Sequence, residues 1–250
     1  MRKIICFLIL ACCLITSTSW AAVSYVSTST WGESEGVVST CSATLTVPSG
    51  HSNVAIFFLA YWLPETVPAV STVVWDPTGA NQSATSVSTK FTAADNRFQG
   101  QIFKLVNPTP GTSKTITLTM NNTVSRCAIT AVVMDGVDQT TPVRAGSYTT
   151  SASNSVTVTS QTGDLTTSGG IGGAAGCGSG AITTNQTLAV SGCNGSPNFD
   201  ATSGQDYATG AATVTHTWSG SSTTGGTAGF SVQAAGAPPP TGSIRHRRVQ

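Results

Sequence analysis

The sequence predicts an all-β protein in which two antiparallel sheets form a single-domain β-sandwich of jelly-roll or immunoglobulin-like type. No segment longer than a turn places apolar residues at the helical period, so helices are not expected. Short β-branched runs instead alternate with Gly, Pro, Asn, Asp and Ser, which is typical of strands joined by turns. Apolar residues make up 39% of the 250 residues, which is enough to form a packed core.

Charge is scarce in this chain and hydroxyl groups are abundant. Only 8% of the residues are charged, against about 25% in an average soluble chain, whereas the chain has 31 serines and 41 threonines. The formal net charge of +1 argues against a strongly basic nucleic-acid binder and against a strongly acidic, solvating chain. We therefore expect hydroxyl groups, rather than Lys and Glu, to solvate the surface.

The N-terminus has the pattern of a secretory signal peptide. Arg2 and Lys3 precede an apolar run over 4–15, and Ser19-Trp20-Ala21 fits the small-x-small rule for cleavage before Ala22. This run is too short for an integral membrane span, which needs about 20 residues, and a lipoprotein site at Cys12 fits less well. The chain thus divides into a signal peptide (1–21), a β-sandwich domain (22–235) and a Pro-rich linker with a basic tail (236–250). The protein is expected to be secreted, extracellular or at the cell surface.

Four cysteines follow the predicted cleavage site: Cys41, Cys127, Cys177 and Cys193. An even number in an exported chain indicates disulfides, with three possible pairings. Cys41 and Cys127 lie in strand-like runs, whereas the other two lie in Gly-rich turns, so we favour 41–127 together with 177–193. A zinc site is disfavoured because no C-x-x-C spacing occurs.

Twelve strands are expected where β-branched and aromatic runs are bounded by turn residues. They lie at 24–30, 37–47, 53–63, 70–76, 84–91, 100–106, 114–121, 126–134, 155–160, 181–190, 211–218 and 227–233. In 114–121 and 211–218 apolar residues alternate with threonines, which predicts one face on the core and one Thr-lined face in water.

Regular Thr rows can order water at an ice surface, but these rows are short, lie on separate strands and form no repeat. The sequence therefore gives ice binding little support.

Three segments do not follow this alternation. Strands 53–63 and 126–134 are apolar on both faces, so each face of these strands must pack against another part of the protein or a partner. Cover by long loops of the same chain is favoured, and a homo-oligomer through the 53–63 sheet is the alternative. The Gly-rich residues 164–180 form either a flexible loop or a weak strand with close backbone approach.

Several segments follow one another in a recognisable order: VSTVVWDPTG (70–79), QIFKLVNPTPGTSKTITLTM (101–120), CAITAVVMDGVDQTTPVRA (127–145), TGDL (162–165), TVTHTWSG (213–220) and AGFSVQAA (228–235). This order resembles a β-sandwich domain family of uncharacterised secreted bacterial proteins and phage or prophage-encoded proteins. The family pattern is an n-P-x-G-t turn followed by a G-V-D-Q-T-T-P loop. The resemblance covers about two-thirds of the mature chain, implies a jelly-roll or immunoglobulin-like sandwich, and transfers no catalytic residues. Residues 169–180 depart from the apolar strand expected there.

Residues suited to catalysis are few. Of the three histidines, His51 and His246 lie in a turn and in the tail. His216 alternates onto the apolar face of its strand, where a hydrogen-bonded core histidine is the better interpretation. No G-x-S-x-G motif occurs, so a triad is not expected. The acidic residues lie mostly at turns, and none forms an evident pair for glycoside cleavage. We therefore do not expect an enzyme.

A calcium site is the best metal candidate in the sequence. Asp135 and Asp138, together with either Asp76 or Asn107, could bring oxygen ligands to one end of the sandwich. The D-G-V-D spacing matches no EF-hand loop, so turn formation is the favoured role of these residues. No cofactor is required by this interpretation.

Aromatic side chains are the candidates for ligand binding. Trp31, Tyr61 and Tyr207 could form a sugar-stacking platform or a protein-binding hot spot if they are exposed. Trp62, Trp75 and Trp218 lie within expected strands and are assigned to the core.

These observations predict a secreted, non-enzymatic structural or adhesion module of a cell surface, an extracellular matrix or a virion. Its partner would be a surface glycan or another surface or virion protein. A carbohydrate-binding module is the alternative, and a secreted polysaccharide-active hydrolase is the third hypothesis. The tail, with Arg245, Arg247 and Arg248, could contact an anionic partner or remain solvated.

Overall fold

The computed structural model describes residues 22–63, 70–87, 89–93, 98–174, 182–194, 200–219 and 225–236. Within these ranges the chain forms strands and no helix, and every strand pair is antiparallel. The predicted all-β, antiparallel sandwich is confirmed. The strands form a nine-stranded, a five-stranded and a three-stranded sheet, so a third, small sheet joins the two expected.

One long strand, β9 (Gly111–Asp135), organises the nine-stranded sheet. Its first part pairs with β4 (Val70–Trp75) and with the second part of β2 (Gly32–Val47). Its last part pairs with β3 (Ala55–Leu63) and β1 (Ser24–Thr28). The sheet therefore doubles over into two layers that enclose one apolar core. The remaining strands of this sheet are β5 (Gln82–Ser83), β6 (Thr85–Ser86), β7 (Phe91–Thr92) and β8 (Gln99–Val106).

The five-stranded sheet covers the second face of β3. It consists of β10 (Thr149–Ser151), β17 (Gly226–Val232), β12 (Leu165–Ala174), β15 (Asp200–Thr209) and β14 (Thr187–Asn194). A second core lies between the two sheets, where the rings of Phe57 and Phe230 are 5.1 Å apart. Residues 55–62 are at most 1% exposed. The expected cover by loops is therefore wrong, and so is a homo-oligomer through this strand, because another sheet of the same chain occupies that face.

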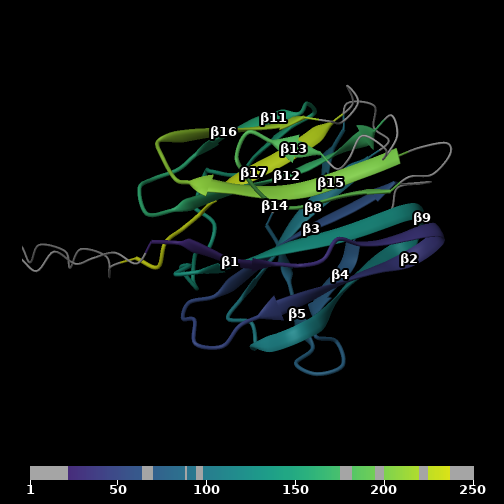
Figure 1. Cartoon of the computed structure of the whole chain (residues 1–250), viewed down its shortest axis with the longest axis horizontal. Helices are drawn as coiled ribbons and strands as arrows, with labels where there is room; N and C mark the ends of the chain where they lie inside the picture. The colour runs from purple at the N-terminus through teal and green to yellow at the C-terminus, as the bar shows by residue number, and fades with distance from the viewer. Residues whose placement is uncertain are drawn as a thin grey trace, which may run out of the picture.

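The three-stranded sheet packs on the far side of the five-stranded one. It contains β11 (Ser155–Thr159), β16 (Thr213–Ser219) and β13 (Thr183–Thr184). Figure 1 shows the resulting stack, with β11, β16 and β13 at the top, β12, β15 and β17 beneath them, then β3, β8 and β9, and β2, β4 and β5 at the bottom.

Glycines allow β12 to lie between two packed layers. A Cβ on Gly169 would lie 2.9 Å from Leu59 of β3, and a Cβ on Gly170 would lie 2.6 Å from the Trp218 ring of β16. Of the two predictions for the Gly-rich segment, a strand with close backbone approach is therefore correct as far as Ala174. Residues 175–180 lie outside the described residues.

The Gly170→Ala variant is expected to lose about 1–3 kcal/mol of unfolding free energy, because the new methyl group would collide with a buried indole ring. Urea unfolding of the variant measures this loss. Gly236→Ala is the matched control, since a Cβ there meets nothing within 4 Å. Equal stability of the two variants would contradict the close packing of β12 against β16.

The Cys41–Cys127 disulfide is present, as expected, and joins β2 to the last part of β9 across the first core. Its Cα atoms are 6.0 Å apart. Cys193 is also disulfide-bonded, and Cys177 lies outside the described residues.

The predicted signal peptide and the tail from residue 237 also lie outside the described residues. The described residues include no helix with the length and apolarity needed to cross a bilayer.

Candidate functional site

A buried polar cluster lies between the five-stranded and three-stranded sheets. His216 of β16 and Asp206 of β15 are both 0% exposed, and His216 Nδ1 lies 2.8 Å from Asp206 Oδ1. The other ring nitrogen, Nε2, lies 3.1 Å from Oγ1 of Thr166 on β12. The core position predicted for His216 is confirmed, and a specific hydrogen-bonded pair holds the ring there.

The Asp206 carboxylate collects donors from three strands. Ser168 donates to Oδ1 from both its hydroxyl (2.7 Å) and its backbone N–H (3.0 Å), and the Thr184 hydroxyl donates to Oδ2 (2.5 Å). Trp218 Nε1 donates to the Ser168 oxygen at 3.0 Å. With His216, these contacts attach β13 and β16 to the sheet below, so the cluster fastens the outermost layer to the rest of the protein.

This Ser, His and Asp grouping does not have the geometry of a catalytic triad. A triad requires the nucleophilic hydroxyl to donate to the imidazole, which the carboxylate orients from its other nitrogen. Here the Ser168 hydroxyl donates to Asp206. The Thr166 hydroxyl lies 3.1 Å from His216 Nε2, but it donates to the Ala208 carbonyl oxygen at 3.2 Å rather than to the ring. All four side chains are at most 1% exposed, so no substrate reaches them. The geometry favours a structural role.

A second buried cluster surrounds Asp164. The sequence places Asp164 at a turn and does not reveal the hydrogen bonds that it makes to distant parts of the chain. Arg144 contacts its carboxylate through both Nε and Nη2, the latter at 2.8 Å from Oδ1. Ser231 Oγ donates to Oδ2 at 2.7 Å, and the Ala234 backbone N–H donates to Oδ1 at 3.2 Å. Burial alone would raise the pKa of Asp164, but the hydrogen bonds from Arg144, Ser231 and Ala234 outweigh it and hold the pKa below its usual value.

Acid is expected to destabilise the protein through Asp164. Because its pKa is lower in the folded state than in the unfolded chain, its contribution is complete above about pH 4 and is lost as the pH falls through the folded-state pKa. Urea unfolding across the acid range measures this loss. Asp164→Asn should reduce the change of unfolding free energy with pH more than Asp138→Asn does. The Asp138 carboxylate also has a lowered pKa, but it is less buried than that of Asp164. Equal slopes for wild type and Asp164→Asn would exclude this role.

The three aspartates considered for calcium have separate roles. Asp135 Oδ2 lies 2.8 Å from His51 Nδ1. Asp138 Oδ1 accepts the backbone N–H groups of Thr140 and Thr141, each at 2.8 Å, as in an Asx turn. Among the described residues, no group of three or more His, Cys, Asp or Glu side chains is arranged to hold a metal ion. Asp135 and Asp138 are thus each engaged in a local contact of their own, and Asp138 has the turn-forming role that the sequence favours.

Asp76, the third of these aspartates, also stabilises a turn. It has a positive φ of 47°, and its Oδ2 accepts the Ala80 backbone N–H at 3.0 Å. Lys114 Nζ lies 3.6 Å from the same oxygen. A Cβ on Gly79 would lie 2.3 Å from Oδ2, so glycine is required at this position.

The aromatic candidates lie mainly between sheets. Tyr61 is 1% exposed, so it is unavailable as a platform because the five-stranded sheet covers it. Tyr207 of β15 is half-buried and stacks on Tyr25 of β1, with ring centroids 4.6 Å apart and planes 6° apart. Burial, followed by the charge of Tyr207, raises the pKa of Tyr25. The expected exposed strip is therefore not formed by these three residues.

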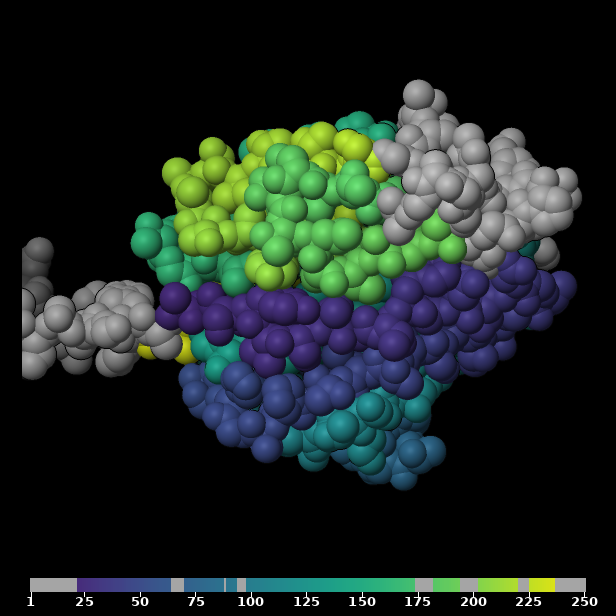
Figure 2. All heavy atoms as spheres, viewed as in Figure 1, coloured from purple at the N-terminus to yellow at the C-terminus, as the bar shows by residue number. Residues whose placement is uncertain are grey.

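Trp31 is half-buried where the edges of the two large sheets meet. Its Nε1 donates to Ser203 Oγ at 2.9 Å, and its ring lies over Gly192, where a Cβ would come within 2.0 Å. Figure 2 shows purple N-terminal residues lying directly against green atoms of the five-stranded sheet. Trp31 and the Tyr25–Tyr207 pair thus connect the sheets. Trp62, Trp75 and Trp218 are buried, as expected.

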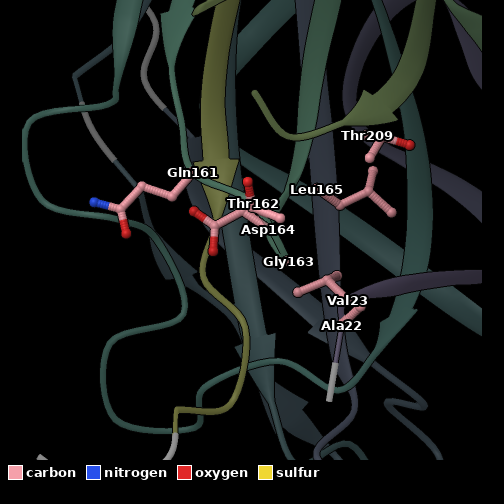
Figure 3. A pocket seen from close by; sticks show the side chains of 8 residues that line it. All are labelled: Ala22, Val23, Gln161, Thr162, Gly163, Asp164, Leu165 and Thr209. Carbon is pink, nitrogen blue, oxygen red and sulfur yellow. The ribbon is translucent and has the colours of Figure 1, made fainter. Parts of the chain in front are cut away.

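A pocket of about 650 Å³ lies at the end of the sandwich, between the start of β1 and the turn joining β11 to β12. Its lining comprises Ala22, Val23, Gln161, Thr162, Gly163, Asp164, Leu165 and Thr209. Figure 3 shows the Asp164 carboxylate directed away from Val23, and its oxygens are bonded to Arg144, Ser231 and Ala234. Among the side chains of this lining, Asp164 is the ionisable one, and its carboxylate is thus already engaged in hydrogen bonds.

Comparisons of the chain with family models, with curated proteins and with solved structures find no match. The function must therefore be argued from the geometry of the chain itself.

Proposed function

We propose that the protein is an exported, non-enzymatic structural or adhesion module of a cell surface, an extracellular matrix or a virion. The observation that carries this proposal is the use of the buried ionisable groups. His216, Asp206, Asp164 and Arg144 bond to one another and to neighbouring hydroxyls between layers, rather than facing the pocket as free groups. The polar chemistry of the described residues is thus directed at holding layers together.

The disulfide and the surface composition support the same proposal. A buried bridge such as Cys41–Cys127 is favoured in oxidising compartments outside the cytosol. The outward positions of β2, β9, β11 and β16 include many Ser and Thr residues. Such a surface remains hydrated without presenting charges to ionic partners.

Thiol trapping combined with surface proteolysis tests the proposal. Intact cells or particles that make the full chain are treated with a membrane-impermeant protease and, in parallel, with an alkylating reagent before lysis. We expect protease-accessible protein in which Cys41 and Cys127 resist alkylation until a reductant is added. Protease-protected protein with freely alkylated Cys41 and Cys127 would refute export. Deleting the gene should reduce attachment or particle integrity without removing a hydrolytic activity.

Carbohydrate binding is the alternative, and the partly exposed Trp31 is the residue that favours it. The ring is fixed by Gly192 beneath it and by its hydrogen bond to Ser203, which suits a rigid stacking surface. A glycan array probed with wild type and with Trp31→Ala decides this point. Binding that disappears in the variant would favour the carbohydrate-binding module over a purely structural role.

A further inference from the structure

One outer face of the nine-stranded sheet consists of regularly placed hydroxyl groups. It is formed by adjacent segments of β2, β9 and β4, whose opposite face packs in the first core. We call it the hydroxyl face and define it by Thr40, Ser42, Thr44, Thr72, Thr115, Thr117 and Thr119. Each of these residues is exposed or half-buried, and no Asp, Glu, Lys or Arg occupies an outward position between them.

The strand register brings these hydroxyls into rows across the sheet. Thr119 of β9 pairs with Thr40 of β2 on one side and with Thr72 of β4 on the other. The next rows place Thr117 opposite Ser42 and Thr115 opposite Thr44. On the β4 side Thr117 pairs with Val74, so that position carries methyl groups and no hydroxyl. Neighbouring hydroxyls are therefore about 4.8 Å apart across the strands and about 6.7 Å apart along them. The rows that look isolated in the sequence form one two-dimensional array in the fold.

Most of these hydroxyls have no partner within the described part of the chain. Thr44 contacts Thr30, with 3.3 Å between the hydroxyl oxygens, whereas the other six side chains make no hydrogen bond to the described residues. The outer face of β11 and β16 differs in this respect. There Ser155 pairs with Thr217 at 3.1 Å and Thr157 with Thr215 at 3.0 Å, so those hydroxyls already have a partner in the protein.

We propose that the hydroxyl face binds the surface of ice crystals. β-branched threonines have a restricted χ1, so the array holds its hydroxyl and methyl groups in fixed positions with little entropy left to lose. An uncharged lattice of water is complementary to a face that has free hydroxyls and no charge. The Asp, Asn, Arg and aromatic side chains that commonly orient sugar rings are missing from its outward positions, which disfavours a polysaccharide as the occupant.

The small size of the hydroxyl face limits how strongly the protein can act on ice. Adjacent strands rotate by about 20–25° relative to one another, so only a few rows of a three-stranded patch can match a flat crystal plane. We therefore expect inhibition of ice recrystallisation, in which weak adsorption slows grain growth, rather than a large depression of the freezing point. This inference is independent of the proposed structural role, which requires no contact with ice.

A recrystallisation assay on the full-length, oxidised protein tests the proposal. Frozen sucrose solution is annealed just below its melting point, and grain size is followed with wild type, Thr117→Lys, Thr119→Lys and the control Thr215→Lys. We expect wild type and Thr215→Lys to keep the grains small, and both hydroxyl-face variants to lose this inhibition while unfolding at the temperature of wild type. Thr117→Val, which keeps a methyl group without the hydroxyl, should be weakened less than Thr117→Lys.

Three outcomes would overturn the proposal. Grain growth with wild type equal to that with albumin is the first, and equal loss of inhibition in Thr215→Lys is the second. The third is a protein that sediments with an insoluble neutral polysaccharide but does not change the growth of ice grains. If Thr117→Lys abolished that sedimentation, the face would be assigned to a polymer instead. None of these results bears on export or surface location, so the proposed function is judged separately.

Discussion

Removing the Cys41–Cys127 disulfide is expected to lower the free energy of unfolding by about 4–5 kcal/mol at 25 °C. The bridge joins residues 86 positions apart, so it removes much of the conformational freedom of the unfolded chain. In the folded state it connects β2 with the last part of β9, on two layers of the doubled sheet. Because a domain of this kind is stable by only about 5–15 kcal/mol, this loss is a large part of the total.

Denaturant unfolding of the Cys41→Ala/Cys127→Ala double variant measures this effect. Each cysteine is 1% exposed, so truncation also removes some packing. Wild-type protein reduced under native conditions keeps both sulfur atoms and serves as the control for the loss of the covalent link alone. A change below about 1 kcal/mol in both samples would mean that the unfolded chain is already constrained near this loop.

The parts of the fold that follow from local periodicity could be predicted. Alternation in 114–121 and 211–218 places Ile116, Leu118 and Trp218 inward, and all three are buried. The same alternation predicts a buried His216, because a strand fixes which face each side chain takes. Strands 114–121 and 126–134 merge into β9, since nothing in the sequence between them forces a turn.

The layers that the sequence did not reveal are held by polar and glycine residues. In β15, Thr202, Gly204 and Asp206 alternate towards the outermost sheet, and all three are buried, yet none is apolar. The packing role of Gly170 in β12 is also not evident from the sequence. Its close approach to Trp218 depends on a strand that is distant along the chain. A hydrophobicity pattern detects burial only where burial is apolar, so β12 and β15 could not be distinguished from loops.

The buried amide of Gln205 shows the same limit. Its Oε1 accepts the Thr130 hydroxyl at 2.9 Å, and its Nε2 donates to the Phe57 carbonyl oxygen at 3.4 Å. These contacts cross the second core, and Gln205 is 1% exposed. A glutamine in a polar run is normally assigned to the surface, and only the packing of β15 on β3 and β9 gives it an interior role.

Asp206→Ala is expected to destabilise the protein by about 3–5 kcal/mol, because it removes one member of a fully buried pair and leaves the other without its partner. The variant would also leave the Thr184 hydroxyl and the Ser168 hydroxyl and backbone N–H without their acceptor. Buried donors that lose their acceptor carry a desolvation penalty. The outermost sheet should loosen first, since β13 and β16 are attached through these contacts.

Hydrogen exchange and denaturant unfolding together measure this loss. Amides of β11, β13 and β16 should exchange faster in Asp206→Ala, whereas those of β3 and β9 should change less. Asp135→Ala is the matched control, because its contact with His51 is partly exposed and such pairs contribute about 1 kcal/mol or less. If both variants lose the same stability, Asp206 does not fasten the layer. If Asp206→Leu/His216→Leu is more stable than Asp206→Ala, the penalty comes from the stranded partner rather than from the loss of an attractive pair.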